Sequence, residues 1–196
     1  MKTTVIGLGL IGGSMALDLR RAGIATELSG VELNPANAKR ALERKLVDRI
    51  DNEGTAISTS DLVIVAIPVN SLSQLLPSVL DNVKKKAVVI DTGSTKRMIC
   101  RSISNHAKRG QCVASHPIAG TENSGPDAAF EGLFKGKTNI ICENELSSAE
   151  ALKIADKVFT ELGMTTIFMD AEEHDKHVAY VSHLSHVSSF LLGQTV

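Results

Sequence analysis

Aromatic side chains are scarce in this chain of 196 residues, which contains no tryptophan, one tyrosine and five phenylalanines. Proteins that bind single-stranded nucleic acid stack bases on aromatic rings, so this composition disfavours such a surface. An excess of one charge is also lacking, because 21 Lys and Arg against 22 Asp and Glu give a formal net charge of −1. A chain with balanced charge has no general attraction for nucleic acid or an anionic membrane. We therefore expect neither as a partner.

Cysteines and long apolar runs are scarce as well. Cys100, Cys112 and Cys142 are odd in number, lie far apart and form no CxxC pair. This pattern predicts buried thiols in a reducing compartment and no disulfide framework. No stretch approaches the ~20 apolar residues of a membrane helix, and the N-terminal segment lacks the cleavage site of a signal peptide. These absences predict a cytoplasmic protein.

The hydrophobic residues, 43% of the chain, form short runs that alternate with helical patterns. Such alternation is typical of βαβ units. The run Leu62–Ile67 (LVIVAI) has no polar alternation, as expected for a strand covered on both faces. The residues 121–137 show no period and predict a long loop near a site. We predict an α/β protein whose Rossmann-type, doubly wound, mostly parallel sheet spans 1–169, with 170–196 as the first helix of an all-α domain.

A glycine-rich turn follows the first predicted strand and opens the first predicted helix. It reads GLGLIG over residues 7–12 and matches the GxGxxG fingerprint of dinucleotide-binding proteins. Gly7 permits the tight turn, Gly9 lets the backbone approach a pyrophosphate, and Gly12 lets helix and strand pack closely. The free N–H groups at the helix N-terminus, where Leu10 and Ile11 lie, are expected to face the phosphates.

Glu32 lies about 20 residues after Gly12, at the end of the second predicted strand. A carboxylate at this position binds the ribose hydroxyls of the adenosine. It would repel a 2′-phosphate, and Leu33 and Asn34 supply no cation, so the sequence predicts NAD and not NADP as the cofactor. Pro68 follows the buried strand directly, and we expect it either to line the cofactor site or merely to end that strand.

Two residues after later strands are candidates for substrate chemistry. Ser94, in the segment DTGS, is expected either to cap the next helix or to bind a substrate hydroxyl. His116 lies at the end of a short strand and is followed by proline in HPIAG. A histidine at this position is suited to acid–base catalysis on a substrate. The alternative is that His116 lies in a turn and has no chemical role.

The last predicted helix contains four histidines. They are His174, His177, His183 and His186. At ~100° per residue they form two pairs on roughly opposite faces of the helix. A zinc site needs three or four converging ligands, so we predict no metal. One pair is expected to face the substrate cleft, and the other to make structural or capping contacts.

Five segments, in this order, closely resemble the prephenate dehydrogenase family: GLGLIGGS, GVELNP, DTGSTK, HPIAGTENSG and HDKHVAYVSHLSH. The resemblance covers essentially the whole chain. It implies an NAD domain followed by an all-helical domain that forms a homodimer. The family converts prephenate to 4-hydroxyphenylpyruvate by oxidative decarboxylation on the route to tyrosine, and some members use arogenate.

The resemblance also implies roles for individual residues. His116 matches the catalytic histidine that accepts the proton of the substrate hydroxyl, and Ser94 matches the serine that bonds the same hydroxyl and orients the histidine. His186 matches a substrate-binding position, which His183 is expected to support. Ser185 stands where the family usually has proline, and we expect this change to straighten the helix locally without altering the site.

Two alternatives stay open at this point. Another Rossmann oxidoreductase, such as a β-hydroxyacid dehydrogenase, requires a catalytic lysine on the helix after the NAD domain, where Lys176 lies. An NAD-binding module without catalysis would keep the glycines and Glu32 but would not need Ser94 together with His116. The family's carboxylate-binding arginine has no match up to Val196, so we expect most of the helical domain to be absent from this sequence.

Overall fold

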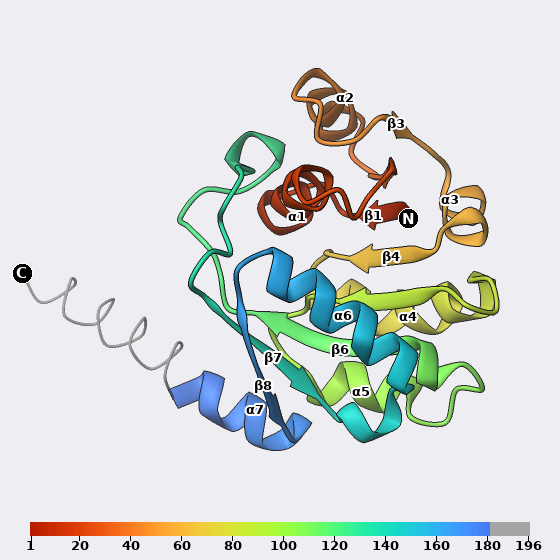
Figure 1. Cartoon of the computed structure of the whole chain (residues 1–196), viewed down its shortest axis with the longest axis vertical. Helices are drawn as coiled ribbons and strands as arrows, with labels where there is room; N and C mark the ends of the chain where they lie inside the picture. The colour runs from red at the N-terminus through yellow and green to blue at the C-terminus, as the bar shows by residue number, and fades with distance from the viewer. Residues whose placement is uncertain (181–196) are drawn as a thin grey trace, which may run out of the picture.

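The computed structural model describes residues 1–180, and residues 181–196 lie outside the described part. An eight-stranded sheet runs through the molecule, with helices on both of its faces (Figure 1). The strands are β1 (Lys2–Ile6), β2 (Glu27–Val31), β3 (Arg49–Ile50), β4 (Leu62–Val65), β5 (Val88–Asp91), β6 (Cys112–Pro117), β7 (Thr138–Cys142) and β8 (Thr165–Met169). The α-helices are α1 (Leu10–Arg21), α2 (Pro35–Glu43), α3 (Glu53–Thr59), α4 (Val69–Asn82), α5 (Arg97–Ile103), α6 (Ala149–Glu161) and α7 (Ala171–Val178).

The strand order is β3-β2-β1-β4-β5-β6-β7-β8, and every neighbouring pair is parallel except β6 and β7. After β1 the chain adds strands toward one edge, and from β4 it adds them toward the other. The sheet is therefore doubly wound, which confirms the predicted fold class. Ligands of such sheets bind outside the carboxyl ends of the strands at the reversal point, which here lies between β1 and β4.

Each face of the sheet has its own apolar core. Ile64 and Ile90 belong to the cluster that includes residues of α1 and α6. Val63 and Val89, one position earlier on each strand, belong to the cluster of α3, α4 and α5. Successive side chains of a strand point to opposite faces, so strands covered on both sides need continuous apolar runs. The LVIVAI segment is such a run, although β4 itself ends at Val65.

Two helices that position the site begin at predictable caps. The Asn34 side chain accepts hydrogen bonds from the backbone N–H groups of Ala36 and Asn37 at 2.9 and 3.2 Å, at the start of α2. Asp170 does the same for the first turn of α7, as its side chain accepts bonds from two backbone N–H groups. Caps of this kind satisfy N–H groups that have no partner within the helix.

The region between α2 and β4 differs from the predicted pattern. It contains the two-residue strand β3 and the helix α3, neither of which was expected. The α3 sequence, EGTAIST, combines glycine with β-branched residues and has weak helical propensity. Its start is stabilised by Asn52, whose side chain accepts a hydrogen bond from Thr55 N at 3.0 Å, and tertiary packing of Ala56 and Ile57 stabilises the rest.

The long loop predicted over 121–137 is present and is fixed to the first two helices. It contains one short turn of 3₁₀-helix, Pro126–Ala128. Phe130 N donates to Ser14 Oγ at 3.0 Å, and Gly132 N donates to the buried Asp18 carboxylate of α1 at 3.0 Å. Arg44, at the end of α2, donates to Ala129 O at 2.8 Å. These bonds hold the loop against α1 and the end of α2.

The three cysteines are buried and unpaired, as predicted. Burial raises the pKa of the Cys112 thiol to about 12. None of the helices in the described part of the chain is both long enough and apolar enough to cross a membrane.

Candidate active site

The turn between β1 and α1 requires glycine at two positions. Gly7 has a φ of +89°, and a Cβ there would clash with the carbonyl oxygen of Ala66. A Cβ on Gly12 would clash with the carbonyl oxygen of Gly7. Around Gly9, in contrast, no atom lies within 4 Å of the position of a Cβ. The turn therefore packs tightly against the rest of the protein at Gly7 and Gly12, whereas Gly9 faces open space.

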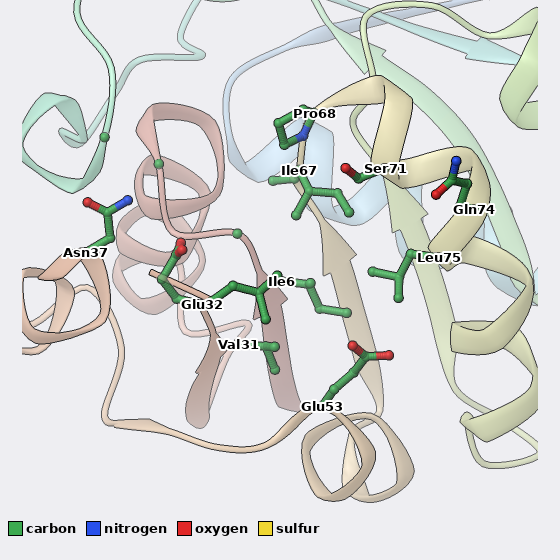
Figure 2. A pocket seen from close by; sticks show the side chains of 15 residues that line it. Ile6, Val31, Glu32, Asn37, Glu53, Ile67, Pro68, Ser71, Gln74 and Leu75 are labelled. Atoms are coloured by element: carbon green, nitrogen blue, oxygen red, sulfur yellow. The ribbon is translucent and has the colours of Figure 1, made fainter. Parts of the chain in front are cut away.

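A cleft of about 630 Å³ opens beside this turn, at the carboxyl ends of β1, β2 and β4 (Figure 2). The residues that line it come from these strand ends, from α2, α3 and α4, and from the long loop. They are Ile6, Gly7, Gly9, Val31, Glu32, Leu33, Asn37, Glu53, Ala66, Ile67, Pro68, Ser71, Gln74, Leu75 and Gly125. The cleft lies at the reversal point of the sheet, where the fold predicts a ligand.

Glu32 is held in this cleft by the backbone. Its carboxylate accepts hydrogen bonds from Leu8 N at 3.1 Å and from Asn34 N at 3.0 Å. Glu53 is the second acid among the described lining residues, which include no lysine or arginine. A fixed carboxylate at the end of β2 can accept hydrogen bonds from two vicinal hydroxyls of a ribose. The negative charges of Glu32 and Glu53 disfavour binding of an additional phosphate on that ribose. The open space at Gly9 and this carboxylate together fit a dinucleotide.

The other predicted cofactor residues occupy two different kinds of position. Pro68 lines the cleft and directly precedes α4, whereas β4 ends three residues earlier at Val65, so Pro68 does not end that strand. Leu10 and Ile11 are half-buried against the core and do not line the cleft. No side chain caps the N-terminus of α1. The backbone N–H groups of Leu10 and Ile11 are therefore free to bind a phosphate.

A second group of side chains surrounds His116, near the end of β6. His116 Nδ1 lies 2.9 Å from His174 Nε2, and His174 Nδ1 lies 2.8 Å from Asp175 Oδ1. His174 is fully buried, although it lies on α7, 58 residues further along the chain. The Asp175 carboxylate also accepts from Lys96 N at 2.7 Å and from Arg97 N at 3.0 Å. Asp175 therefore caps the N-terminus of α5 while it bonds His174.

A buried ion pair lies next to this group. Lys96 is fully buried, and its Nζ donates to the Asp91 carboxylate and, at 2.6 Å, to Ser115 O. Asp91 ends β5 and Ser115 precedes His116 on β6. Because β5 and β6 are parallel neighbours, the pair joins the end of β5, which leads to Ser94, to the end of β6, which contains His116.

Burial and charge keep the two histidines neutral. Burial, aided by the positive charge of Lys96, lowers the pKa of His116 to about 3. Burial also lowers the pKa of His174, although its hydrogen bond to Asp175 opposes the shift. Partial burial works against ionisation of Asp175, but hydrogen bonds from Lys96 N, His174 and Arg97 N lower its pKa below the usual value.

Ser94 lies on the exposed loop that follows β5, and the structure excludes one of its two expected roles. The helix α5 begins at Arg97 without a cap from its own N-terminal side chains, since Asp175 of α7 supplies the cap. The hydroxyl of Ser94 makes no hydrogen bond within residues 1–180, so it is available to a ligand. Ser94 lies beyond the carboxyl end of β5, and His116 lies near the carboxyl end of β6, on the same edge of the sheet as the cleft.

The histidines of the last helix are not arranged as predicted. His174 and His177 do not act as a pair, since His174 is buried against His116 while His177 is exposed and bonds Glu173 O of its own helix at 2.8 Å. Lys176 would be the catalytic lysine if the chain were a β-hydroxyacid dehydrogenase. Its side chain is exposed and forms an ion pair with Glu172 at 3.4 Å. The predictions for His183, Ser185 and His186 lie outside the described residues.

The sequence did not single out His174, Asp175 or Lys96 as partners of His116. One signal was present, because a lysine at the start of a predicted helix, such as Lys96, lies at the positive end of the helix dipole and is unfavourable there unless it is paired. The pairing itself joins segments 58 and 79 residues apart, and no local pattern encodes such a distance.

Comparisons with known proteins agree with this geometry. Residues 15–168 match the family described as prephenate dehydrogenase, nucleotide-binding domain. Over 189 residues the chain is 32% identical to cyclohexadienyl dehydrogenase of Zymomonas mobilis, covering 96% of this chain and 64% of that protein. It spans about half to two thirds of the length of three curated relatives that it matches.

Solved structures of two relatives share the fold. Prephenate dehydrogenase of Aquifex aeolicus, in complex with hydroxyphenyl propionate and NAD⁺, superposes with a TM-score of 0.89 at 28% identity, covering 100% of this chain and 69% of that one. Arogenate dehydrogenase of Synechocystis superposes with a TM-score of 0.86 at 32% identity, with coverage of 100% and 69%.

Proposed function

The chain belongs to the prephenate dehydrogenase family, and from this membership and the geometry of the site we propose that it binds NAD and oxidatively decarboxylates prephenate to 4-hydroxyphenylpyruvate in tyrosine biosynthesis. The observation that carries the proposal is the position of His116. It lies on the same edge of the sheet as a cleft that fits a dinucleotide, and a side-chain network fixes its ring.

The cofactor part of the proposal rests on the β1–α1 turn and Glu32. The free N–H groups of the first turn of α1 bind the pyrophosphate, and Gly9 leaves room for it. Glu32, held by Leu8 N and Asn34 N, accepts hydrogen bonds from the ribose hydroxyls. The acidic rim formed by Glu32 and Glu53 makes a 2′-phosphate unfavourable, so NAD is bound in preference to NADP.

The chemical part rests on His116. When bound, NAD supplies the acceptor for the hydride that leaves ring C4 of the substrate. His116 is neutral at physiological pH and accepts the proton of the C4 hydroxyl as the carbonyl develops. The bond between ring C1 and its carboxylate then breaks, CO₂ leaves, and its electron pair completes the aromatic ring. His116 returns the proton to the phenolate oxygen, so no net proton is consumed.

Ser94 and the helix histidines complete the proposed site. The Ser94 hydroxyl bonds the same C4 hydroxyl and orients it toward His116. His186, supported by His183, contacts the substrate. In this proposal residues 1–169 form the NAD domain, and α7 begins the helical domain through which the protein forms a homodimer.

Arogenate is the second candidate substrate. The Zymomonas relative is named a cyclohexadienyl dehydrogenase and the Synechocystis relative an arogenate dehydrogenase, at 32% identity each. Arogenate has the same ring and C4 hydroxyl as prephenate, so His116 and Ser94 would act on it in the same way. The choice between the two substrates depends on the side chains that meet the substrate's aliphatic arm.

The test is NADH formation at 340 nm with prephenate and with arogenate, each with NAD and with NADP, on this chain and on a chain extended past Val196. We expect turnover with NAD and at least one of the two substrates. Binding of NAD without turnover by either protein would favour the non-catalytic NAD-binding module. Turnover with NADP alone would overturn the role given to Glu32.

A further inference from the structure

Three side chains form a hydrogen-bonded row that ends at His116. The row runs from the Asp175 carboxylate to His174 Nδ1 at 2.8 Å, and from His174 Nε2 to His116 Nδ1 at 2.9 Å. The described part of the chain gives no other hydrogen-bond partner to either histidine ring, so these contacts decide which ring nitrogens carry protons.

The direction of each hydrogen bond follows from the charge at the far end. Asp175 is ionised and can only accept, so His174 Nδ1 must donate to it. A neutral imidazole that donates from Nδ1 has a lone pair on Nε2, so His174 Nε2 accepts from His116 Nδ1. His116 therefore has its proton on Nδ1 and a lone pair on Nε2. The nitrogen of His116 that can accept a proton, Nε2, is therefore the one left for the substrate.

The charges around His116 explain why such a row is needed. Burial, the buried Lys96 and the neighbouring His174 all disfavour a positive charge on His116, and among the groups that face it Asp175 alone favours one. Asp91 is already paired with Lys96. A proton taken up at His116 Nε2 is stabilised when the Nδ1 proton shifts toward His174 Nε2, because the positive charge then lies beside the Asp175 carboxylate.

We propose that His174 and Asp175 are positioning residues, which hold His116 in the tautomer with Nδ1 protonated and share the positive charge that His116 acquires from the substrate. The inference rests on the proposed function of His116 and adds two residues from α7 to it. Asp175 binds the start of α5 as well, so α7 must be docked for the base to be in its active tautomer.

The first test measures the tautomer without substrate. Long-range ¹H–¹⁵N correlation spectra of the histidine-labelled chain, with the His116 signal assigned from a His116→Asn variant, report which nitrogen is protonated. We expect protonated Nδ1 on His116 in the wild type, and a mixture of tautomers in His174→Phe, which can neither accept nor donate. Wild-type His116 protonated on Nε2 would overturn the proposal.

The second test separates positioning from charge sharing. In His174→Gln, the amide oxygen still accepts from His116 Nδ1 but cannot take up a proton, and in Asp175→Asn the carboxylate charge is lost. We expect kcat to fall about 10- to 100-fold in both. Loss of the aspartate that bonds the catalytic histidine of a serine protease costs about 10⁴-fold. The loss should be smaller here, because the glutamine of His174→Gln still accepts from His116 Nδ1 and because Asp175 is separated from His116 by His174. The Kd for NAD is expected to stay unchanged.

The pH profile distinguishes this role from a structural one. Because Asp175 raises the pKa of His116, its neutralisation should move the acid limb of kcat/KM to lower pH. The matched control is His177→Gln on the exposed face of the same helix, which should change neither kcat nor the profile. Unchanged kcat in both His174→Gln and Asp175→Asn would overturn the proposal. Absence of wild-type turnover with either substrate would instead remove the proposed function, while the tautomer measurement would still be interpretable.

Discussion

The cofactor cleft and the histidine network lie on the same edge of one sheet, but they are built in opposite ways. The cleft is made largely by the backbone, through a glycine turn of six residues and a carboxylate held by two N–H groups. The network around His116 is made by buried side chains from β5, β6, α5 and α7. The cleft can therefore tolerate changes in surrounding side chains, whereas the network depends on each of its members.

The substitution His116→Asn should give the largest separation between the two regions. It removes the base but not the cleft, so we expect kcat to fall by about 10³-fold, within the range for loss of a general base. The Kd for NAD, measured by calorimetry, should be unchanged. Wild-type turnover in this variant would remove His116 from the reaction, and a matching loss of NAD affinity would show that the two regions are not independent.

Gly12→Val should produce the converse effect. Its side chain meets the carbonyl oxygen of Gly7, so the turn must open and the N–H groups of α1 move away from the phosphates. We expect NAD affinity to fall by about 100-fold, equivalent to about 2.7 kcal/mol, together with a lower Tm. Gly54→Ala is the control, because a Cβ at Gly54 meets no atom closer than 3.9 Å. Normal NAD binding by Gly12→Val would contradict the geometry of the turn.

Glu32→Gln should have a smaller and more specific effect. Removal of the charge weakens the hydrogen bonds to the ribose and relieves the repulsion of a 2′-phosphate, so affinity for NAD should fall about 10-fold while affinity for NADP falls less or rises. Glu27→Gln is the control, since Glu27 pairs with Lys2 at the opposite end of β2. An unchanged NAD to NADP ratio would exclude Glu32 from cofactor selection.

The pH dependence of stability should provide the smallest signal of the histidine network. The pKa of His116 and that of His174 are lower in the folded chain than in the unfolded chain. Between about pH 6.5 and 4.5 the unfolded state therefore binds more protons, and stability decreases as the pH falls. Thermal unfolding across this window should show a smaller decrease in Tm for His116→Asn than for the wild type. An equal decrease would mean that the fold does not hold His116 neutral.

The same contrast explains which parts of the site the sequence could predict. The turn at Gly7–Gly12 is contiguous, and the distance from it to Glu32 is set by one βαβ unit, so local pattern and chain geometry were sufficient. Pro68 could be located in the same way. For Ser94 the sequence left two roles open, and the cap that excludes one of them comes from Asp175, on a helix 79 residues from Lys96.

The missed elements follow the same rule. The strand β3 is too short to have a pattern, and α3 has weak intrinsic propensity and depends on the packing of Ala56 and Ile57 under the sheet. His174 and His177 are alike in the helical pattern, but they differ completely once α7 lies against α5. Periodicity gives the faces of a helix and does not show which face another element will cover.

By itself the sequence determined the doubly wound sheet, the position of the glycine turn and the carboxylate that follows β2, because each of these depends on spacing within one or two neighbouring elements. The tertiary structure alone decided that His116, His174 and Asp175 form one row above a buried Lys96–Asp91 pair. Hydrogen bonds of about 2.9 Å between distant segments require the packed sheet and helices to bring them together. The protonation states of the histidines then follow from burial, which the packing of the folded chain creates.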